Sequence, residues 1–189
     1  MKVGLLALQG AIEPHARALR ALGAAPIEVR TPEQLAGVDA LVIPGGESTT
    51  MSKLLDSSGL AHPLRARLAH GMPTFGTCAG MIVLAATVLD GRADQRSYAA
   101  IDLTVRRNAF GRQIDSFEAD LLVTGLASSF HAVFIRAPFV EQVGDGVEVL
   151  AAINGHPVLC RQGSVLVSAF HPELTTDHRL HELFLSLID

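Results

Sequence analysis

Short apolar runs alternate with longer amphipathic segments over the first half of the chain. The apolar runs lie at residues 3–8, 27–29, 41–43 and 74–75, and the helical patterns at residues 12–22, 50–55 and 60–70. This alternation predicts βαβ units and a parallel sheet. Because the runs are continuously apolar rather than alternating with polar residues, we expect helices to cover both faces of the sheet.

The second half carries shorter strand patterns and one final helix. Strand candidates lie at residues 103–105, 121–123, 133–135, 147–153, 158–161 and 165–169. They predict a partly antiparallel extension of the sheet, and the polar segment 91–97 is a candidate mobile loop. Leu180, Leu183, Phe184 and Leu187 share one face at helical spacing, so residues 177–188 are expected to form a helix that docks on the sheet.

The composition suits one α/β domain spanning residues 1–189. A chain of 189 residues with 49% hydrophobic side chains can bury a core without disulfides or metal ions. A net charge of −4, interspersed charge signs and the absence of Trp argue against nucleic-acid binding. No run approaches the roughly 20 apolar residues that span a membrane. The two cysteines, Cys78 and Cys160, lie far apart, which fits a reducing cytoplasm.

A thiol stands at a tight turn between an apolar strand and an apolar segment. The motif GTCAG at residues 76–80 follows the strand and precedes the apolar segment 81–89, which we expect to be helical. Small residues around Cys78 permit a strained corner that lifts its side chain off the sheet edge. The start of a helix also favours thiolate over thiol. A buried structural cysteine packed between glycines fits these five residues about as well.

A base and an orienting carboxylate follow the last strand candidate. A cysteine nucleophile needs a base, and the base needs a group that orients it. His171 and Glu173 are two residues apart after an apolar run, so in an extended chain they project to the same side. The carboxyl ends of parallel strands form the edge where ligands bind, so Cys78 is expected nearby. A strand-end histidine and a carboxylate at the start of the final helix are the structural alternatives.

Two glycines follow the third apolar run. The backbone N–H groups of Gly45 or Gly46, together with that of Ala79, are candidates for an oxyanion hole at the carbonyl that the thiolate attacks. An ordinary glycine-rich turn, with Ser48 or Thr49 as the N-cap of the next helix, is compatible with this role.

Taken together, the motifs resemble a known family. They are PGGEST at 44–49, FGTCAG at 75–80, RNAFGRQ at 107–113, DSFEADL at 115–121, FIRAP at 134–138 and FHPELT at 170–175. In this order they are similar to the glutaminase subunits of pyridoxal 5'-phosphate synthase, which are class I triad glutamine amidotransferases. The resemblance covers nearly the whole chain. GxCxG with a distant HPE is shared by triad glutaminases, whereas GGEST, RNAFGRQ and FIRAP are specific to this subunit.

The resemblance implies a flavodoxin-like class I glutaminase fold and the hydrolysis of L-glutamine to L-glutamate and ammonia. The ammonia would pass to a separate synthase subunit in a large hetero-oligomer, with no metal or organic cofactor. Cys78 would be the nucleophile that forms a glutamyl thioester, His171 the general base and acid, and Glu173 the group that orients the imidazole.

The resemblance also implies a set of glutamine-binding positions. They fall on Gly46, Glu47, Ser48, Arg107, Ile135 and Arg136. A guanidinium group suits the α-carboxylate of the substrate because it can bind a carboxylate with two parallel hydrogen bonds. Pairing with a surface glutamate is the alternative for each arginine.

The chain departs from the family pattern in two places. Residues 97–101 lack the usual apolar Leu-Gly-Leu type of sequence, and Arg106 stands where an acidic residue is usual. These departures put the local loop geometry and the pairing of Arg107 in doubt. Gln9 and Gly10 follow the first strand, where a role in partner-dependent activation and a simple turn are equally compatible.

The remaining chemistry-bearing residues have weaker context. His178 and His181 beside Glu182 are expected on a solvated helix face rather than in a metal site. Cys160 is expected in the core, and His15 has no motif context. The competing interpretation of the chain is a non-catalytic or thiol redox-sensing protein on the same fold, since fold does not fix function. A redox sensor has no need of His171-Pro172-Glu173.

Overall fold

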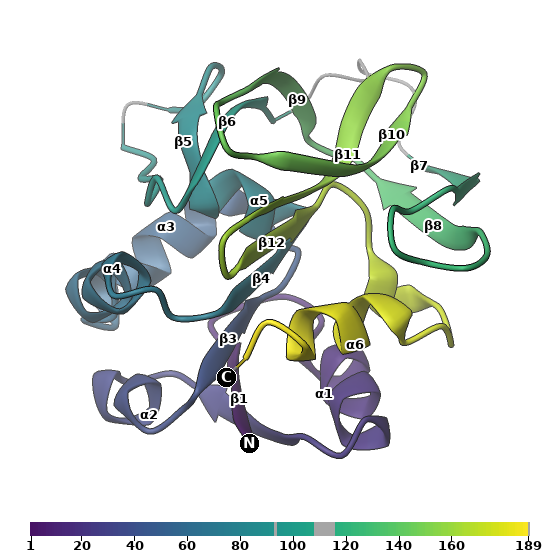
Figure 1. Ribbon diagram of the computed structural model, residues 1–189. Coiled ribbons are helices and arrows are strands. Elements are labelled where there is room, and N and C mark those ends of the chain that lie inside the picture. Colours follow the sequence, from purple (N-terminus) through teal and green to yellow (C-terminus); the bar gives the residue numbers. More distant parts are fainter. Residues whose placement is uncertain (93, 108–115, 189) are drawn as a thin grey trace.

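A central mixed sheet organises the molecule (Figure 1). The computed structural model describes residues 1–92, 94–107 and 116–188, and within them seven strands pair in the order β10-β11-β12-β4-β3-β1-β2. The strands are β1 (Lys2–Leu6), β2 (Ala25–Val29), β3 (Ala40–Ile43), β4 (Thr74–Thr77), β10 (Glu148–Ile153), β11 (His156–Gln162) and β12 (Val165–Ser168). Pairing is parallel from β2 to β12 and antiparallel from β12 to β10. The predicted α/β class and its antiparallel extension are confirmed.

Helices cover both faces of this sheet. They are α1 (Ile12–Ala21), α2 (Pro32–Ala36), α3 (Ser48–Ser57), α4 (Ala61–Ala69), α5 (Ala79–Leu84) and α6 (Arg179–Leu185). In Figure 1, α1 and α6 lie to the right of the sheet, whereas α2, α3 and α4 lie to its left. The short α2 was not predicted; it starts at Thr31, whose side chain forms a capping box with Gln34. Across the described ranges, every helix is too short or too polar to cross a bilayer.

Smaller sheets extend the molecule beyond the strand ends (Figure 1). One contains β5 (Ala85–Val88), β6 (Ile101–Arg106) and β9 (Phe139–Val143), and the other pairs β7 (Ser116–Leu121) with β8 (Phe130–Ile135). Strand β9 was not predicted, and of the strand candidate at 121–123 only Leu121 lies in a strand, as the last residue of β7. These sheets carry residues of the candidate site from β6 and β8.

The expectation of a continuous helix over the segment 81–89 is wrong. Helix α5 ends at Leu84, and the backbone turns into β5 at Ala85, where ψ is 154°. The N–H groups of residues 98 and 100 donate to the carbonyl oxygens of Val83 and Leu84 at 2.9 and 2.8 Å. Pairing with a distant segment therefore replaces the next helical turn.

The final helix is shorter than expected, and its buried face is wider than expected. Leu180 and Phe184 are fully buried, as the apolar pattern predicts. His181 is also fully buried, so the expectation that it lies on a solvated face is wrong. Helix α6 packs beside α1, and this contact directs the His181 ring towards His15. Cys160 is buried in β11 as expected, and burial raises the pKa of its thiol to about 12.

Strand register brings three loops to the same edge of the sheet. Ile43 of β3 is paired with Gly76 of β4, and Thr77 is paired with Ser168 of β12. The segments that follow these strands therefore leave the sheet at the same level, as expected for parallel strands at a ligand-binding edge. They carry Gly45, Cys78 and His171.

Candidate active site

Cys78 occupies a strained corner between β4 and α5. Its φ is 50° and its ψ is −103°, a conformation that L-residues rarely adopt. The glycines on either side are required by close packing. A Cβ atom on Gly76 would lie 2.7 Å from the carbonyl carbon of Gly80, and one on Gly80 would collide with the carbonyl oxygen of Ile43. The predicted sharp turn is present, and its geometry matches that of a nucleophile elbow.

His171 and Glu173 form a hydrogen-bonded pair directly after β12. The Nδ1 atom of His171 lies 2.7 Å from Oε1 of Glu173, whose side chain is fully buried. The backbone N–H of His171 donates to the carbonyl of Val133 at 2.9 Å, which fixes the start of the turn. Glu173 lies in a 3-10 turn (Pro172–Leu174), not at the N-terminus of the final helix.

The electrostatics of this pair favour an imidazolium beside a carboxylate. Burial would lower the pKa of His171, but hydrogen bonds to Cys78 and Glu173 and the charges of both partners raise it to about 10. Burial would raise the pKa of Glu173, but the hydrogen bond from His171 and the nearby histidines lower it. The structure thus brings Cys78, His171 and Glu173 together in the order that thiol catalysis requires.

A cavity of about 260 Å³ opens beside the thiol. Its lining consists of Gly46, Glu47, Ser48, Cys78, Ile82, Arg107, Ile135, Arg136 and His171. Every position named above for glutamine binding is in this set. Ile82 was missed by sequence reasoning, although it follows Cys78 by four residues and so lies on the same face of α5.

The glycine-rich loop after β3 approaches the base closely. A Cβ atom on Gly45 would lie 2.5 Å from Cε1 of His171 and 3.5 Å from Cβ of Cys78. Gly46 has a φ of 155°, and Gln9 packs against it while donating from Nε2 to the carbonyl of Glu47 at 2.5 Å. Ala79 follows Cys78 directly and is buried. The oxyanion-hole role of Gly45, Gly46 and Ala79 stays a prediction.

Substitution of Gly45 by alanine is expected to lower kcat for the glutamine hydrolysis that the sequence resemblance implies by about 10²-fold, because the added methyl group displaces the imidazole from the thiol. The matched control is Gly37→Ala, where φ is −90° and the nearest atom would be 3.6 Å from the new Cβ. Steady-state glutamate release by both variants tests this expectation. Equal kcat values for the two variants would show that Gly45 tolerates a side chain beside His171.

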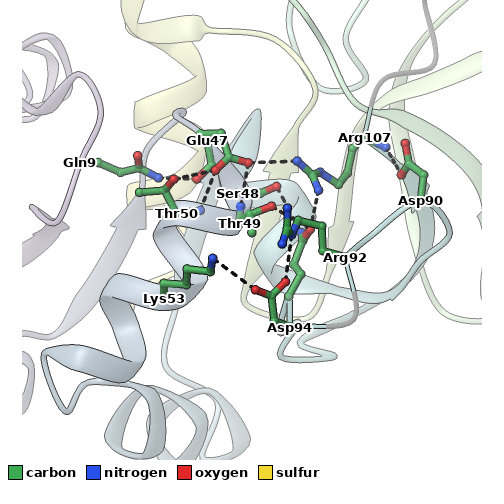
Figure 2. A network of polar contacts seen from close by, with 11 residues as sticks. Gln9, Glu47, Ser48, Thr49, Thr50, Lys53, Asp90, Arg92, Asp94 and Arg107 are labelled. Atoms are coloured by element: carbon green, nitrogen blue, oxygen red, sulfur yellow. Dashed lines mark hydrogen bonds and ion pairs between the residues drawn. The ribbon is translucent and has the colours of Figure 1, made fainter.

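Glu47 caps α3 and pairs with Arg107 (Figure 2). The expectation of Ser48 or Thr49 as N-cap is wrong, since the Glu47 carboxylate accepts from the backbone N–H groups of Thr49 and Thr50 at 2.9 and 2.7 Å. Burial opposes ionisation, but bonds from both threonines lower the pKa of Glu47 to about 2. The carboxylate satisfies the first helical N–H groups that Ser48 and Thr49 were expected to satisfy.

Arg107 is held from several sides. Its guanidinium donates to Oε1 of Glu47 at 2.9 Å, and its backbone N–H donates to Asp90 at 2.7 Å (Figure 2). The guanidinium also donates to Oε1 of Gln95 at 2.9 Å. Gln95 also donates to Oγ of Ser48 at 3.2 Å. Sequence reasoning missed Gln95 because it assigned the segment 91–97 only to a polar loop. The surface Arg–Glu alternative is therefore what the structure shows for Arg107.

The guanidinium group of Arg136 is more accessible to a substrate than that of Arg107. It follows β8 with a φ of 44°, lines the cavity and is exposed. Within the part of the chain that the structure describes, its guanidinium forms no ion pair. Of the two arginines, Arg136 is better placed to bind a substrate carboxylate.

Comparisons with known proteins assign the chain to a family. A model of the SNO glutamine amidotransferase family matches residues 5–189. The chain belongs to this family. Members of it include proteins 57 to 60% identical to the chain that are named "Pyridoxal 5'-phosphate synthase subunit PdxT". The one from Mycobacteroides abscessus is 60% identical, covering 98% of this chain and 96% of the relative, and the one from Frankia alni is 57% identical, covering 99% and 94%.

Solved structures agree with this assignment. A crystal structure described as that of a glutamine amidotransferase superposes with a TM-score of 0.92 at 52% identity, covering 98% of this chain and 97% of the other. PurLQS from Thermotoga maritima has a TM-score of 0.66 at 14% identity, covering 98% and 97%, and shares the fold. The predicted fold and the resemblance on which it was based are confirmed.

The two departures from the family pattern have local explanations. Arg106 pairs with Glu141 at 2.7 Å, on the neighbouring strand β9, and so does not compete for the partners of Arg107. In the atypical segment 97–101, Tyr98 is buried and its backbone pairs with Val83. Residues 108–113 of the RNAFGRQ motif lie outside the described residues. The partners of Arg106 and of the Tyr98 backbone are thus different from those of Arg107.

Proposed function

We propose that this protein is the glutaminase subunit of pyridoxal 5'-phosphate synthase. It hydrolyses L-glutamine to L-glutamate and ammonia and supplies the ammonia to a separate synthase subunit, with which it forms a large hetero-oligomer for vitamin B6 biosynthesis. The observation that carries the proposal is the strained Cys78 beside His171 and the buried Glu173, at the end of a cavity of about 260 Å³. Membership of the glutamine amidotransferase family supports the substrate, and the name of the relatives supports the partner.

A group of this chain is available for each step of the proposed reaction. The Cys78 thiolate attacks the side-chain amide carbon of glutamine, and the carbonyl electron pair moves to the oxygen. Backbone N–H groups of Gly45 or Gly46 and of Ala79 stabilise that oxyanion. When it collapses, the C–N bond breaks, and the His171 imidazolium protonates the departing nitrogen to give ammonia and a glutamyl thioester.

The second half of the reaction reuses the same base. Neutral His171 takes a proton from water, and the resulting hydroxide attacks the thioester carbon. The C–S bond breaks, and glutamate leaves with the thiolate restored. Glu173 holds the imidazole in one orientation throughout. A thiolate, an imidazole and backbone donors supply every step, so the reaction needs no metal or organic cofactor.

The cavity provides complementary charges for an α-amino acid. Arg136 is the proposed partner of the α-carboxylate, and Arg107 lines the same cavity while paired with Glu47. The Glu47 carboxylate, which stays ionised because its pKa is about 2, is the proposed partner of the α-ammonium group. Gly46, Ser48 and Ile135 complete the lining around the substrate side chain. Residues 1–189 act as one glutamine amidotransferase domain in the cytoplasm, with no nucleic-acid or membrane partner.

The test is glutamate and ammonia release from L-glutamine by the purified protein, alone and with the synthase subunit. We expect stoichiometric release of both products, at a higher rate in the complex. Absence of glutamate under both conditions would contradict glutaminase activity and favour the redox-sensing alternative. Equal rates alone and in the complex would contradict a role of the partner in activating the site.

A further inference from the structure

Two buried histidines lie next to Glu173 of the triad. His15 is on α1 and His181 is on α6, and both are fully buried. The Nδ1 atom of His15 lies 2.9 Å from Nε2 of His181, and the ring centroids are 5.2 Å apart. Two buried imidazoles joined by a hydrogen bond are costly to maintain unless they satisfy another group. The other nitrogen of His15 indicates which group that is.

The Nε2 atom of His15 faces the carboxylate of Glu173. It lies 3.5 Å from Oε2 of Glu173 and 3.4 Å from Oγ1 of Thr77, the residue before the nucleophile. The other carboxylate oxygen, Oε1, is bonded to His171. Each oxygen of Glu173 therefore faces a different imidazole. Oε2 forms no hydrogen bond with any described residue, and its contact with Nε2 of His15 at 3.5 Å is electrostatic.

The protonation states of His15 and His181 can be assigned from their contacts. Burial lowers the pKa of His15, and burial together with the neighbouring His15 lowers the pKa of His181 to about 3, so both rings are neutral. The carboxylate 3.5 Å away favours the tautomer of His15 that carries its proton on Nε2. Its Nδ1 then accepts from Nε2–H of His181. The remaining nitrogen, Nδ1 of His181, is then a lone pair without a hydrogen-bond partner among the described residues.

We propose that His15 and His181 are positioning residues for this reaction, acting through Glu173. They extend the triad into a buried chain that runs from Cys78 through His171, Glu173 and His15 to His181, and the His15 N–H fixes the rotation of the Glu173 carboxylate. The proposal rests on the proposed function, because it assigns Glu173 its role towards His171.

The physical basis is the electrostatic attraction between the His15 ring N–H and the buried Oε2 atom 3.5 Å away. In a buried site of low dielectric, such an attraction is stronger than it would be in water. Without His15, Oε2 loses this attraction, and the carboxylate is oriented less strictly towards His171. Misplacement of a catalytic group by about 1 Å can cost 10²-fold in rate.

Three variants and a control test the proposal. His15→Leu removes the donor and is expected to lower kcat about 10- to 100-fold with KM for glutamine unchanged, since His15 does not line the cavity. His15→Gln keeps a side-chain N–H at similar reach and is expected to restore most of kcat. His181→Phe removes only the outer donor, so a smaller loss is expected. The control is Phe184→Leu, which loosens the same helix against Phe75 without touching the hydrogen-bonded chain.

The outcomes separate a positioning role from a structural one. Wild-type kcat in His15→Leu would overturn the proposal, and so would a loss that His15→Gln does not restore or that Phe184→Leu reproduces. If His15→Leu fails to fold, an unchanged kcat in His181→Phe overturns it instead. Failure of the proposed function is distinguishable, because the wild-type protein would then release no glutamate.

Discussion

Cys78→Ala is expected to abolish glutamine hydrolysis, with kcat at least about 10⁴-fold below that of the wild type. Alanine keeps the Cβ atom but removes the sulfur, so no glutamyl thioester can form. The fold should persist, because Gly76 and Gly80, not the thiol, meet the packing demands of the corner. Glutamate release measures the lost turnover. The intact mass of the protein, recorded after incubation with glutamine and quenching of the reaction, shows whether the acyl adduct is missing.

The second cysteine offers a matched control. Cys160 is fully buried in β11 and lies outside the cavity lining. Cys160→Ala is therefore expected to reduce the free energy of unfolding while leaving kcat close to that of the wild type. Turnover that survives in Cys78→Ala, or that disappears equally in both variants, would refute the assignment of the nucleophile.

His171→Asn is expected to lower kcat by a similar factor, at least about 10⁴-fold, while the protein remains folded. Asparagine can neither protonate the departing ammonia nor deprotonate water. His70→Asn is the control, because His70 lies at the end of α4 with its ring bonded to the carbonyl of Ala66. Unfolding of His171→Asn, in place of an inactive folded protein, would show a structural role for this histidine.

The same variant should change how stability depends on pH. The pKa of His171 is raised from 6.5 to about 10, so its ion pair stabilises the folded state fully below pH 6.5, and this stabilisation is lost as the pH rises towards 10. The pKa of Glu173 is lowered, so its contribution is present above its usual pKa of 4.5 and is lost as the pH falls through the lowered value. The difference in unfolding free energy between wild type and His171→Asn should shrink from pH 6.5 to 10. Urea titrations across this range test it, and a constant difference contradicts it.

Much of the fold could be predicted because its signals are local. Continuous apolar runs indicated β1, β3 and β12 closely, since parallel strands buried on both faces carry no polar alternation. The elements that were missed depend on distant partners. Strand β9 has an exposed second half and exists because it pairs with β6, and β5 replaces a helical turn because residues 98–100 pair with its start.

The residues of the candidate site also divide into those with a local sequence signal and those whose contacts depend on distant elements. Cys78, His171 and Glu173 could be grouped from sequence because each follows a strand whose end must reach the same edge. Gln95 and His181 could not, since their contacts depend on how separate elements pack in three dimensions. A signal for His181 did exist: it precedes Phe184 by three residues and Leu180 immediately precedes it, so the buried face of α6 is wide enough to include it.

Strands β3, β4 and β12 end at the same level of the sheet, which has a further consequence for where the protein can accept insertions or exchanges. The thiol, its base and the glycine loop directly follow paired strands, so the backbone hydrogen bonds of the sheet fix the spacing between them. Arg107 and Arg136, by contrast, stand at the ends of β6 and β8 in the smaller appended sheets. Insertions or exchanges in those sheets can therefore alter which amide is selected without disturbing the machinery that cleaves it.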